Sequence, residues 1–263
     1  MLPLFKSHYS IGKSILTLQK PSVSISSEAE LSDGPASIFT IASDNKLNQL
    51  VLVEDSLVGF LEAQKQATDL NIQLIFGLRV SICHDMSIVE NKNTQECIHK
   101  IVIFAKNDNG CQLLNKIYSL AFTKGAGKID FKSLKELYND KDLKIAIPFY
   151  DSYLFHNSFS YKEPCMLDDS FFEPVYFIED NKLPFDIILQ DLISNYCDQN
   201  GFNTQMCKSI YYEKREDFEA YQTYKCICNR SFSSKARTLD MPNIDHCASP
   251  EFCFESYLDY ESL

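Results

Sequence analysis

Two acidic residues follow a short apolar run, at the place where a buried strand is expected to end. Leu50 to Val53 is continuously apolar, and Glu54 and Asp55 come directly after it. Such a pair could act as a general base at the carboxyl end of a strand, where barrel proteins place their functional side chains. Arg79 follows the next apolar run, so a guanidinium is expected at the same edge.

The segment from Lys46 to Val80 contains the elements that would hold these side chains. Apolar residues recur at near-helical spacing over 58–70, and Ile72 to Phe76 is a second buried strand closed by Gly77. Two buried strands joined by one helix predict a right-handed βαβ unit. Further strands are expected at 4–5, 37–43, 79–82, 99–105, 144–148, 175–178 and 203–210. Further helices are expected at 111–122, 130–138, 187–197 and 216–228, with another near Ser249-Pro250-Glu251.

This alternation of strands and helices predicts an α/β fold, either a barrel or a doubly wound sheet. Apolar residues make up 45% of the chain, which is ordinary for a protein that buries a core. No internal repeat and no convincing linker divides the 263 residues. We therefore expect one domain that covers residues 1–263.

The composition limits the partners that the chain can have. A formal net charge of −11 argues against strong direct binding of nucleic acid and suits a basic protein partner. No stretch approaches the roughly 20 apolar residues of a membrane-spanning helix, and the N-terminus lacks the apolar core of a signal peptide. We therefore expect a cytoplasmic protein whose ten cysteines are reduced.

The cysteines and histidine near the C-terminus allow two interpretations. Cys226, Cys228, His246, Cys247 and Cys253 include types that bind zinc. Zinc sites more often separate paired cysteines by two to four residues, whereas the first two here would point from different faces of a helix. We favour small buried or surface thiols over a zinc site.

Three other polar or aromatic segments are interpreted without a chemical role. His8 is expected to be a surface or hydrogen-bonded loop residue, and Cys83-His84-Asp85 is expected to be exposed beside a hairpin tip at 85–94. Phe149 to His156 could stack on single-stranded bases, but it lacks interleaved Lys or Arg. A packed loop or a protein-contact surface is the favoured interpretation there.

Five short motifs occur in a collinear order along almost the whole chain. They are KSHYS at 6–10, LVEDSLVGFLE at 52–62, NIQLIFGLR at 71–79, the stretch 99–114 with Ala105-Lys106-Asn107 and Gly110, and Ser249-Pro250-Glu251 after 216–220. In order and spacing they resemble the PHP domain (polymerase and histidinol phosphatase) of bacterial replicative DNA polymerase III alpha subunits. The resemblance implies a single PHP-type distorted (β/α)7 barrel with metal ions at the C-terminal rim.

The resemblance also locates the positions where the family carries its metal ligands. In this chain those positions are occupied by Lys6, Glu54, Asp55, Arg79, Tyr150, Ser209 and Tyr211, and the first family histidine falls at Leu2. A further histidine position falls at Lys100, or at His99 if the register shifts by one. Arginine is not deprotonated in proteins and cannot ligate a metal. We therefore expect a degenerate site with no cofactor, in which Lys6 and Arg79 pair with Glu54 or Asp55.

The expected function is that of a non-catalytic module in DNA replication. The resemblance implies a protein partner, either a polymerase body or a proofreading exonuclease, in a bacterial or virus-infected cell. Roughly the last 15 residues, 249–263, are interpreted as a tail or as the start of a polymerase region. The alternative is a metal-dependent phosphoesterase or 3'-5' exonuclease. That enzyme would use zinc, manganese or magnesium with an unusual ligand set drawn from Glu54, Asp55 and His99.

Overall fold

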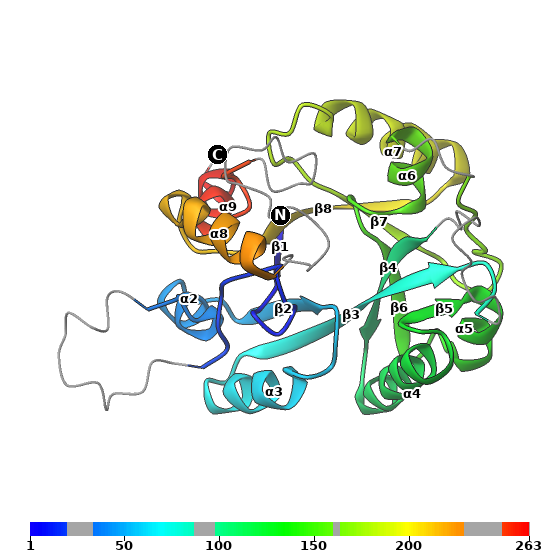
Figure 1. Ribbon diagram of the computed structural model, residues 1–263, viewed down its shortest axis with the longest axis horizontal. Coiled ribbons are helices and arrows are strands. Elements are labelled where there is room, and N and C mark those ends of the chain that lie inside the picture. The colour runs from blue at the N-terminus through cyan, green and yellow to red at the C-terminus, as the bar shows by residue number, and fades with distance from the viewer. Residues whose placement is uncertain (20–33, 87–97, 160–163, 229–248, 263) are drawn as a thin grey trace.

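The computed structural model describes residues 1–19, 34–86, 98–159, 164–228 and 249–262. It is a mixed α/β structure in which seven strands close into a barrel and helices surround it (Figure 1). The barrel strands are β1 (Leu2–Phe5), β2 (Gln49–Glu54), β3 (Gln73–Cys83), β4 (His99–Ala105), β6 (Leu143–Ile147), β7 (Val175–Ile178) and β8 (Asn203–Ile210). The short strand β5 (Lys128–Asp130) pairs with β3 beside the barrel.

The helices pack around the outside of the barrel, as Figure 1 shows. They are α2 (Ile38–Asp44), α3 (Phe60–Asp69), α4 (Asp108–Lys124), α5 (Phe131–Leu137), α6 (Tyr153–Phe159), α7 (Asp186–Asn200), α8 (Phe218–Cys228) and α9 (Phe254–Glu261). A single 3-10 turn, Arg215–Asp217, leads into α8. In the part of the chain that the structure describes, no helix is long and apolar enough to cross a membrane.

Strand pairing closes the barrel in the order β2-β1-β8-β7-β6-β4-β3, and β3 pairs back onto β2. Neighbouring strands are parallel except at β4, which runs antiparallel to both β3 and β6. An antiparallel neighbour needs no crossover helix, so β3 and β4 follow each other as a hairpin. The prediction of a barrel is therefore confirmed. The barrel is not built of parallel strands throughout, because β4 runs antiparallel to both of its neighbours.

Side chains alternate between the inside and the outside of the barrel along each strand. The interior cluster consists of Leu4, Val51, Val53, Val102, Ala146, Phe177 and Cys207. Intervening residues such as Phe5, Leu50 and Leu52 join the larger cluster between the strands and the helices. Both faces of β2 are therefore covered, which explains why its sequence is continuously apolar.

The expected βαβ unit is present, but not all the apolar residues at helical spacing over 58–70 are buried. β2 and β3 are parallel and joined by α3, and β3 continues through Gly77 to Cys83. Ala63 and Ala67 are the buried residues of α3, whereas Val58 and Leu61 are 69% and 79% exposed. Phe60 also contacts the sheet, with its ring centroid 5.0 Å from that of Phe76 on β3.

The prediction of a strand at 37–43 is wrong, because this segment forms α2. Ile38, Phe39, Ile41 and Ala42 are all buried, a spacing that fits one face of a helix. Phe149 to His156 is not only a loop, because α6 begins at Tyr153. The C-terminal helix begins at Phe254 and not near Ser249.

The described cysteines are mostly free thiols. Seven are free, but Cys165 is disulfide-bonded, so the expectation of ten reduced cysteines is wrong at that residue. Beside the hairpin, His84 is exposed as expected while Cys83 is buried. His246, Cys247 and most of the hairpin tip at 85–94 lie outside the described residues.

Gly110 gives a test of how closely α4 packs on the barrel. A Cβ at this position would lie 2.2 Å from the Asp142 carbonyl oxygen, whereas a Cβ at Gly34 would have nothing within 4 Å. Alanine normally stabilises a helix relative to glycine by about 1 kcal/mol. At this position we expect the opposite effect. Gly110→Ala should lower the free energy of unfolding by about 1–3 kcal/mol, because the backbone at Asp142 must shift to make room for the methyl group.

The measurement is the free energy of unfolding in urea, with Gly34→Ala as the matched control. A Gly110→Ala variant as stable as the parent would contradict the close contact between α4 and the Asp142 carbonyl.

Candidate functional site

The candidate site is the barrel mouth, by which we mean the rim at the C-terminal ends of the parallel strands. Leu4 on β1 and Val53 on β2 point into the barrel. Two residues further along the chain come Lys6 and Asp55. Continuing the same alternation places Lys6 and Asp55 over the barrel interior, two residues beyond buried apolar side chains. On β3, Arg79 also lines this mouth.

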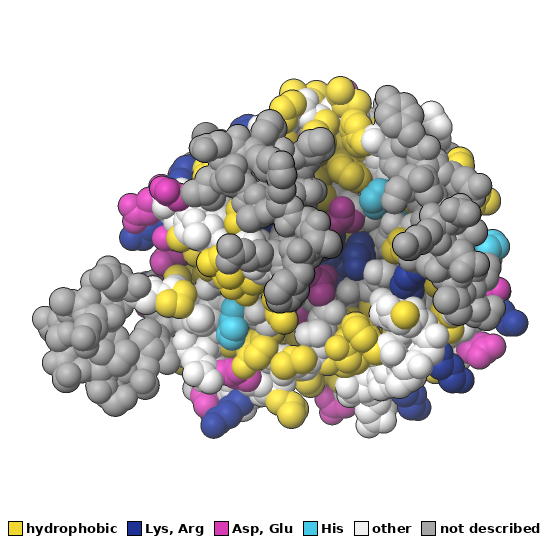
Figure 2. Space-filling view, in the orientation of Figure 1, with side chains coloured by type: hydrophobic (Ala, Val, Ile, Leu, Met, Phe, Trp, Pro, Cys, Tyr) yellow, Lys and Arg dark blue, Asp and Glu magenta, His cyan; other side chains and the backbone are white. Residues whose placement is uncertain are grey.

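A pocket opens at the barrel mouth and encloses about 460 Å³ of empty space, part of it open to solvent. Its apolar floor comes from the barrel interior, and its polar wall comes from the strand ends. Figure 2 shows basic and acidic side chains together at the centre of this face. The lining residues include Leu4, Lys6, Val53, Arg79, Val102, Tyr150, Phe177, Glu179, Ser209 and Tyr211.

Ion pairs connect the strand ends across the mouth. The Lys6 ammonium lies 3.3 Å from one Asp55 oxygen, and an Arg79 guanidinium nitrogen lies 3.8 Å from the other. Arg79 also donates a hydrogen bond to Asp151, which follows β6. The expected pairing of Lys6 and Arg79 with Asp55 is therefore present.

Asp55 lies in a positive electrostatic environment. Burial opposes its ionisation, but attraction from Lys6, Arg79, Lys100 and Lys13 outweighs burial and lowers the pKa of Asp55 from 3.8 to about 2. Burial lowers the pKa of Lys6, and Asp55 opposes that shift. Asp55 is therefore held as a carboxylate between cations.

Glu54 is adjacent to Asp55 but faces the other side of the strand, and it does not pair with Lys6 or Arg79 as expected. One of its oxygens accepts a hydrogen bond from the Ser7 backbone N–H at 2.8 Å, and the other accepts one from the Ser10 hydroxyl. Burial raises the pKa of Glu54, and attraction from Lys6 and these hydrogen bonds oppose the shift. Glu54 is fully buried and holds the loop after β1 in place.

His99 lies on the outer face of β4, away from the pocket. Its ring packs against Phe131 and Tyr153, with centroids 6.0 and 5.9 Å away. Burial lowers the pKa of His99 to about 4. Glu54, Asp55 and His99 contact three different sets of neighbours, so the structure does not bring these three candidates together.

Two of the expected ligand positions, Tyr150 and Ser209, are joined by residues that the sequence analysis missed. Glu179 accepts hydrogen bonds from the Ser209 N–H at 3.0 Å, the Ser209 hydroxyl at 2.9 Å and the Asn181 amide at 2.9 Å. The same Asn181 amide donates to the Tyr150 hydroxyl at 3.0 Å, and Tyr150 donates to Asp186 at 3.0 Å. A usable signal existed, since Glu179 follows an apolar strand as Glu54 does.

Tyr211 completes the wall of the pocket after β8. Its ring stacks on Phe252 with centroids 5.3 Å apart and an interplanar angle of 6°, and it lies 5.9 Å from the ring of Tyr221. Tyr211 is 7% exposed. An aromatic stack therefore occupies one of the expected ligand positions.

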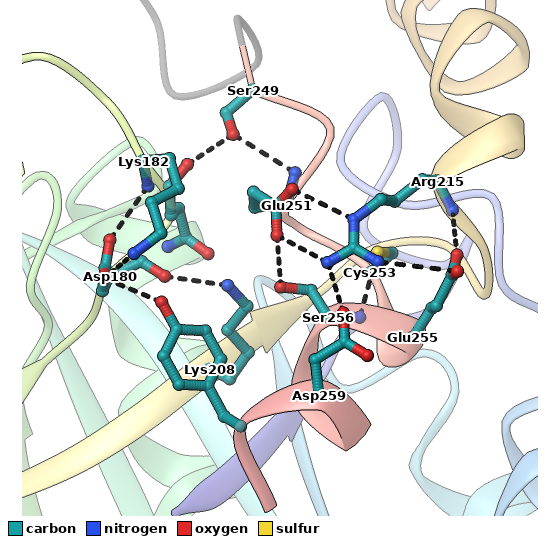
Figure 3. A network of polar contacts seen from close by, with 12 residues as sticks. Asp180, Lys182, Lys208, Arg215, Ser249, Glu251, Cys253, Glu255, Ser256 and Asp259 are labelled. Carbon is teal, nitrogen blue, oxygen red and sulfur yellow. Dashed lines mark hydrogen bonds and ion pairs between the residues drawn. The ribbon is translucent and has the colours of Figure 1, made fainter. Parts of the chain in front are cut away.

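The Ser249-Pro250-Glu251 motif attaches the C-terminal helix to the rim, as Figure 3 shows. The Ser249 hydroxyl donates to the Asn181 carbonyl, and two Arg215 nitrogens each donate to Glu251 at 3.0 Å. Nearby, the buried Lys208 ammonium donates to the Asp180 carbonyl at 2.8 Å. The motif therefore has a structural role next to the mouth.

The cysteines and the loop histidine have no visible chemical role among the described residues. Cys226 and Cys228 are half-buried free thiols on α8, and the buried Cys253 caps α9. The His8 Nδ1 atom lies 3.3 Å from the Leu16 carbonyl oxygen, and its ring packs at a tilt against Tyr9, as expected of a hydrogen-bonded loop residue. Within the described ranges, no three His, Cys, Asp or Glu side chains are placed to hold a metal ion together.

Comparisons with known proteins do not assign the chain to a family. No family model matches the sequence, and no curated protein matches it.

The ion pairs of Asp55 lead to a pH-dependent contribution to stability. Because its folded pKa of about 2 lies below the ordinary 3.8, Asp55 stabilises the fold above pH 3.8 and loses this contribution as the pH falls towards 2. At about 1.4 kcal/mol per pKa unit, the contribution is on the order of 2 kcal/mol. We expect the stability difference between the parent and Asp55→Asn to shrink over this pH range.

Urea unfolding at a series of pH values measures this difference. Asp69→Asn, which removes an exposed carboxylate at the end of α3, controls for the loss of one negative charge. A difference for Asp55→Asn that stays constant down to the lowest pH would contradict the ion pairing.

Proposed function

We propose that this chain is a PHP-like barrel that works as a binding module without a metal centre. The observation that supports this proposal is the placement of Lys6 and Arg79 in the barrel mouth, where both pair with Asp55. In the resembled family these strand ends carry metal ligands. Here they carry two basic side chains, and the charge of Arg79 is fixed because arginine is not deprotonated in proteins.

The energetic argument is electrostatic. Two unit charges about 4 Å apart interact by about 4 kcal/mol at the effective dielectric of a protein surface. A divalent cation beside Lys6 and Arg79 would be repelled by both, while the nearby Asp55 carboxylate is already paired. The arrangement favours ion pairs over metal coordination at this site.

The proposed biological role is to contact the polymerase body or a proofreading exonuclease during DNA replication. This part of the proposal draws on the resemblance of the ordered motifs. The acidic chain, with a formal net charge of −11, suits a basic protein surface because complementary charge speeds and orients association.

Metal binding separates this proposal from the enzyme alternative. We expect isothermal titration of the parent protein with zinc, manganese or magnesium to show no tight stoichiometric binding. The double variant Lys6→His with Arg79→Glu removes both cations and supplies ligand types that zinc accepts, next to Asp55. We expect this variant to gain zinc binding.

A matched control makes comparable changes on the exposed surface of α4, with Lys116→His and Lys124→Glu, and is expected to gain none. Tight stoichiometric metal binding by the parent protein would contradict the proposal and favour a metal-dependent phosphoesterase or exonuclease.

The partner is tested by affinity purification of the full chain from the organism that encodes it. We expect a replicative polymerase or a proofreading exonuclease to co-purify and to be identified by mass spectrometry. The association should weaken as salt is raised, because complementary charges are screened. Recovery of the chain without either protein at low salt would argue against the replication role.

A further inference from the structure

The Lys6 ammonium is buried without a complete set of acceptors. Lys6 lines the pocket and is 4% exposed. Its nitrogen lies 3.3 Å from an Asp55 oxygen, a contact poorly aligned for a hydrogen bond, and it has no other hydrogen-bond partner among the described residues. An ammonium has three donors, and leaving them unsatisfied in a buried site costs free energy. A bound acceptor in the pocket would recover part of that cost.

The antiparallel strand β4 brings a third cation to the mouth. Because β4 runs opposite to its neighbours, its N-terminal end lies at the rim where theirs terminate. Val102 lines the pocket, and the alternation of the strand places Lys100 on the same side. The Lys100 ammonium donates a hydrogen bond to the Ser81 hydroxyl at 2.6 Å. Ser81 lies two residues after Arg79 on β3.

Three basic side chains meet at the mouth of this acidic protein. Lys6, Arg79 and Lys100 face Asp55 and Asp151, and Lys13 acts on Asp55 as well. Glu179 also lines the pocket, and Glu54 attracts Lys6 from the other side of β2. Burial favours the neutral forms of both glutamates, and it likewise lowers the pKa of Lys6 and Lys100. At Asp55 the basic groups prevail, because attraction from Lys6, Arg79, Lys100 and Lys13 outweighs burial.

The pocket therefore offers cations at its rim and an apolar floor of Leu4, Val53, Val102 and Phe177. We propose that the barrel mouth binds a small organic anion, whose carboxylate or phosphate group is held directly by Lys6 and Arg79. Asp151 holds Arg79 in position for this contact. The inference rests on the proposed function in one respect, that the mouth holds no metal ion.

Carboxylates and phosphates both carry negatively charged oxygens. These oxygens accept charge-assisted hydrogen bonds from ammonium and guanidinium groups. Acetate and inorganic phosphate are the two probes. Each is titrated into the full chain with a chelator present, and binding is followed by calorimetry and by the thermal unfolding midpoint. We expect at least one probe to release heat and to raise the midpoint, since a ligand that binds the native state stabilises it.

Lys6→Met tests the location of the site. We expect it to weaken binding at least about tenfold, because it removes the buried charged donor. Lys116→Met removes the same charge from the exposed surface of α4 and should leave the affinity within about twofold. Lys100→Gln provides a second test if Lys6→Met does not fold. This variant should weaken anion binding by a smaller factor than Lys6→Met, because Lys100 attracts the anion without being proposed to contact it.

The outcomes are distinct. Failure of both probes to bind, or binding that Lys6→Met and Lys100→Gln leave unchanged, would overturn the inference. If neither anions nor metals bind, the anion inference fails and the metal-free proposal stands. If phosphate binds only in the presence of manganese or zinc, both fail. Preference for one probe identifies whether the head group is a carboxylate or a phosphate.

Discussion

The closure of the barrel is the constraint on which the rest of this structure depends. Each strand places alternate side chains inside, so residues from distant parts of the sequence must meet at one rim. Lys6, Asp55 and Arg79 come from three strands that are neighbours in the barrel. Their ion pairs are consequences of closure. Closure also brings two basic side chains to the mouth of a protein whose net charge is −11.

The contrast between Glu54 and Asp55 shows how much this alternation decides. The two residues are adjacent and chemically similar, yet Glu54 binds Ser7 and Ser10 outside the barrel while Asp55 pairs with cations over its interior. Burial raises the pKa of the first, whereas nearby cations lower the pKa of the second. The sequence suggests that Glu54 and Asp55 act as one acid–base pair. In the structure the two side chains lie on opposite sides of the strand and have separate partners.

Much of the fold could be predicted because its strands are short, apolar and bounded by polar residues. β4, β7 and β8 have the expected bounds, and Asn107 and Asp130 cap α4 and α5 by accepting hydrogen bonds from backbone N–H groups. α2 was mistaken for a strand because a short apolar run has no clear period. The hairpin tip expected at 85–94 implied that β4 runs antiparallel to β3, but its antiparallel pairing with β6 could not be predicted, because that pairing depends on contacts between distant segments.

The sequence by itself determined the alternation of strands and helices, the apolar interior and the set of charged residues that follow the strands. It also placed the basic residues Lys6 and Arg79 at the ends of expected strands, because side-chain type is local information. Only the tertiary structure decided which charges meet. It paired Asp55 with Lys6 and Arg79, placed His99 on the outer face and joined Glu179 to Ser209. The physical reason is that strand register and barrel closure, and not proximity in sequence, set the distances between side chains.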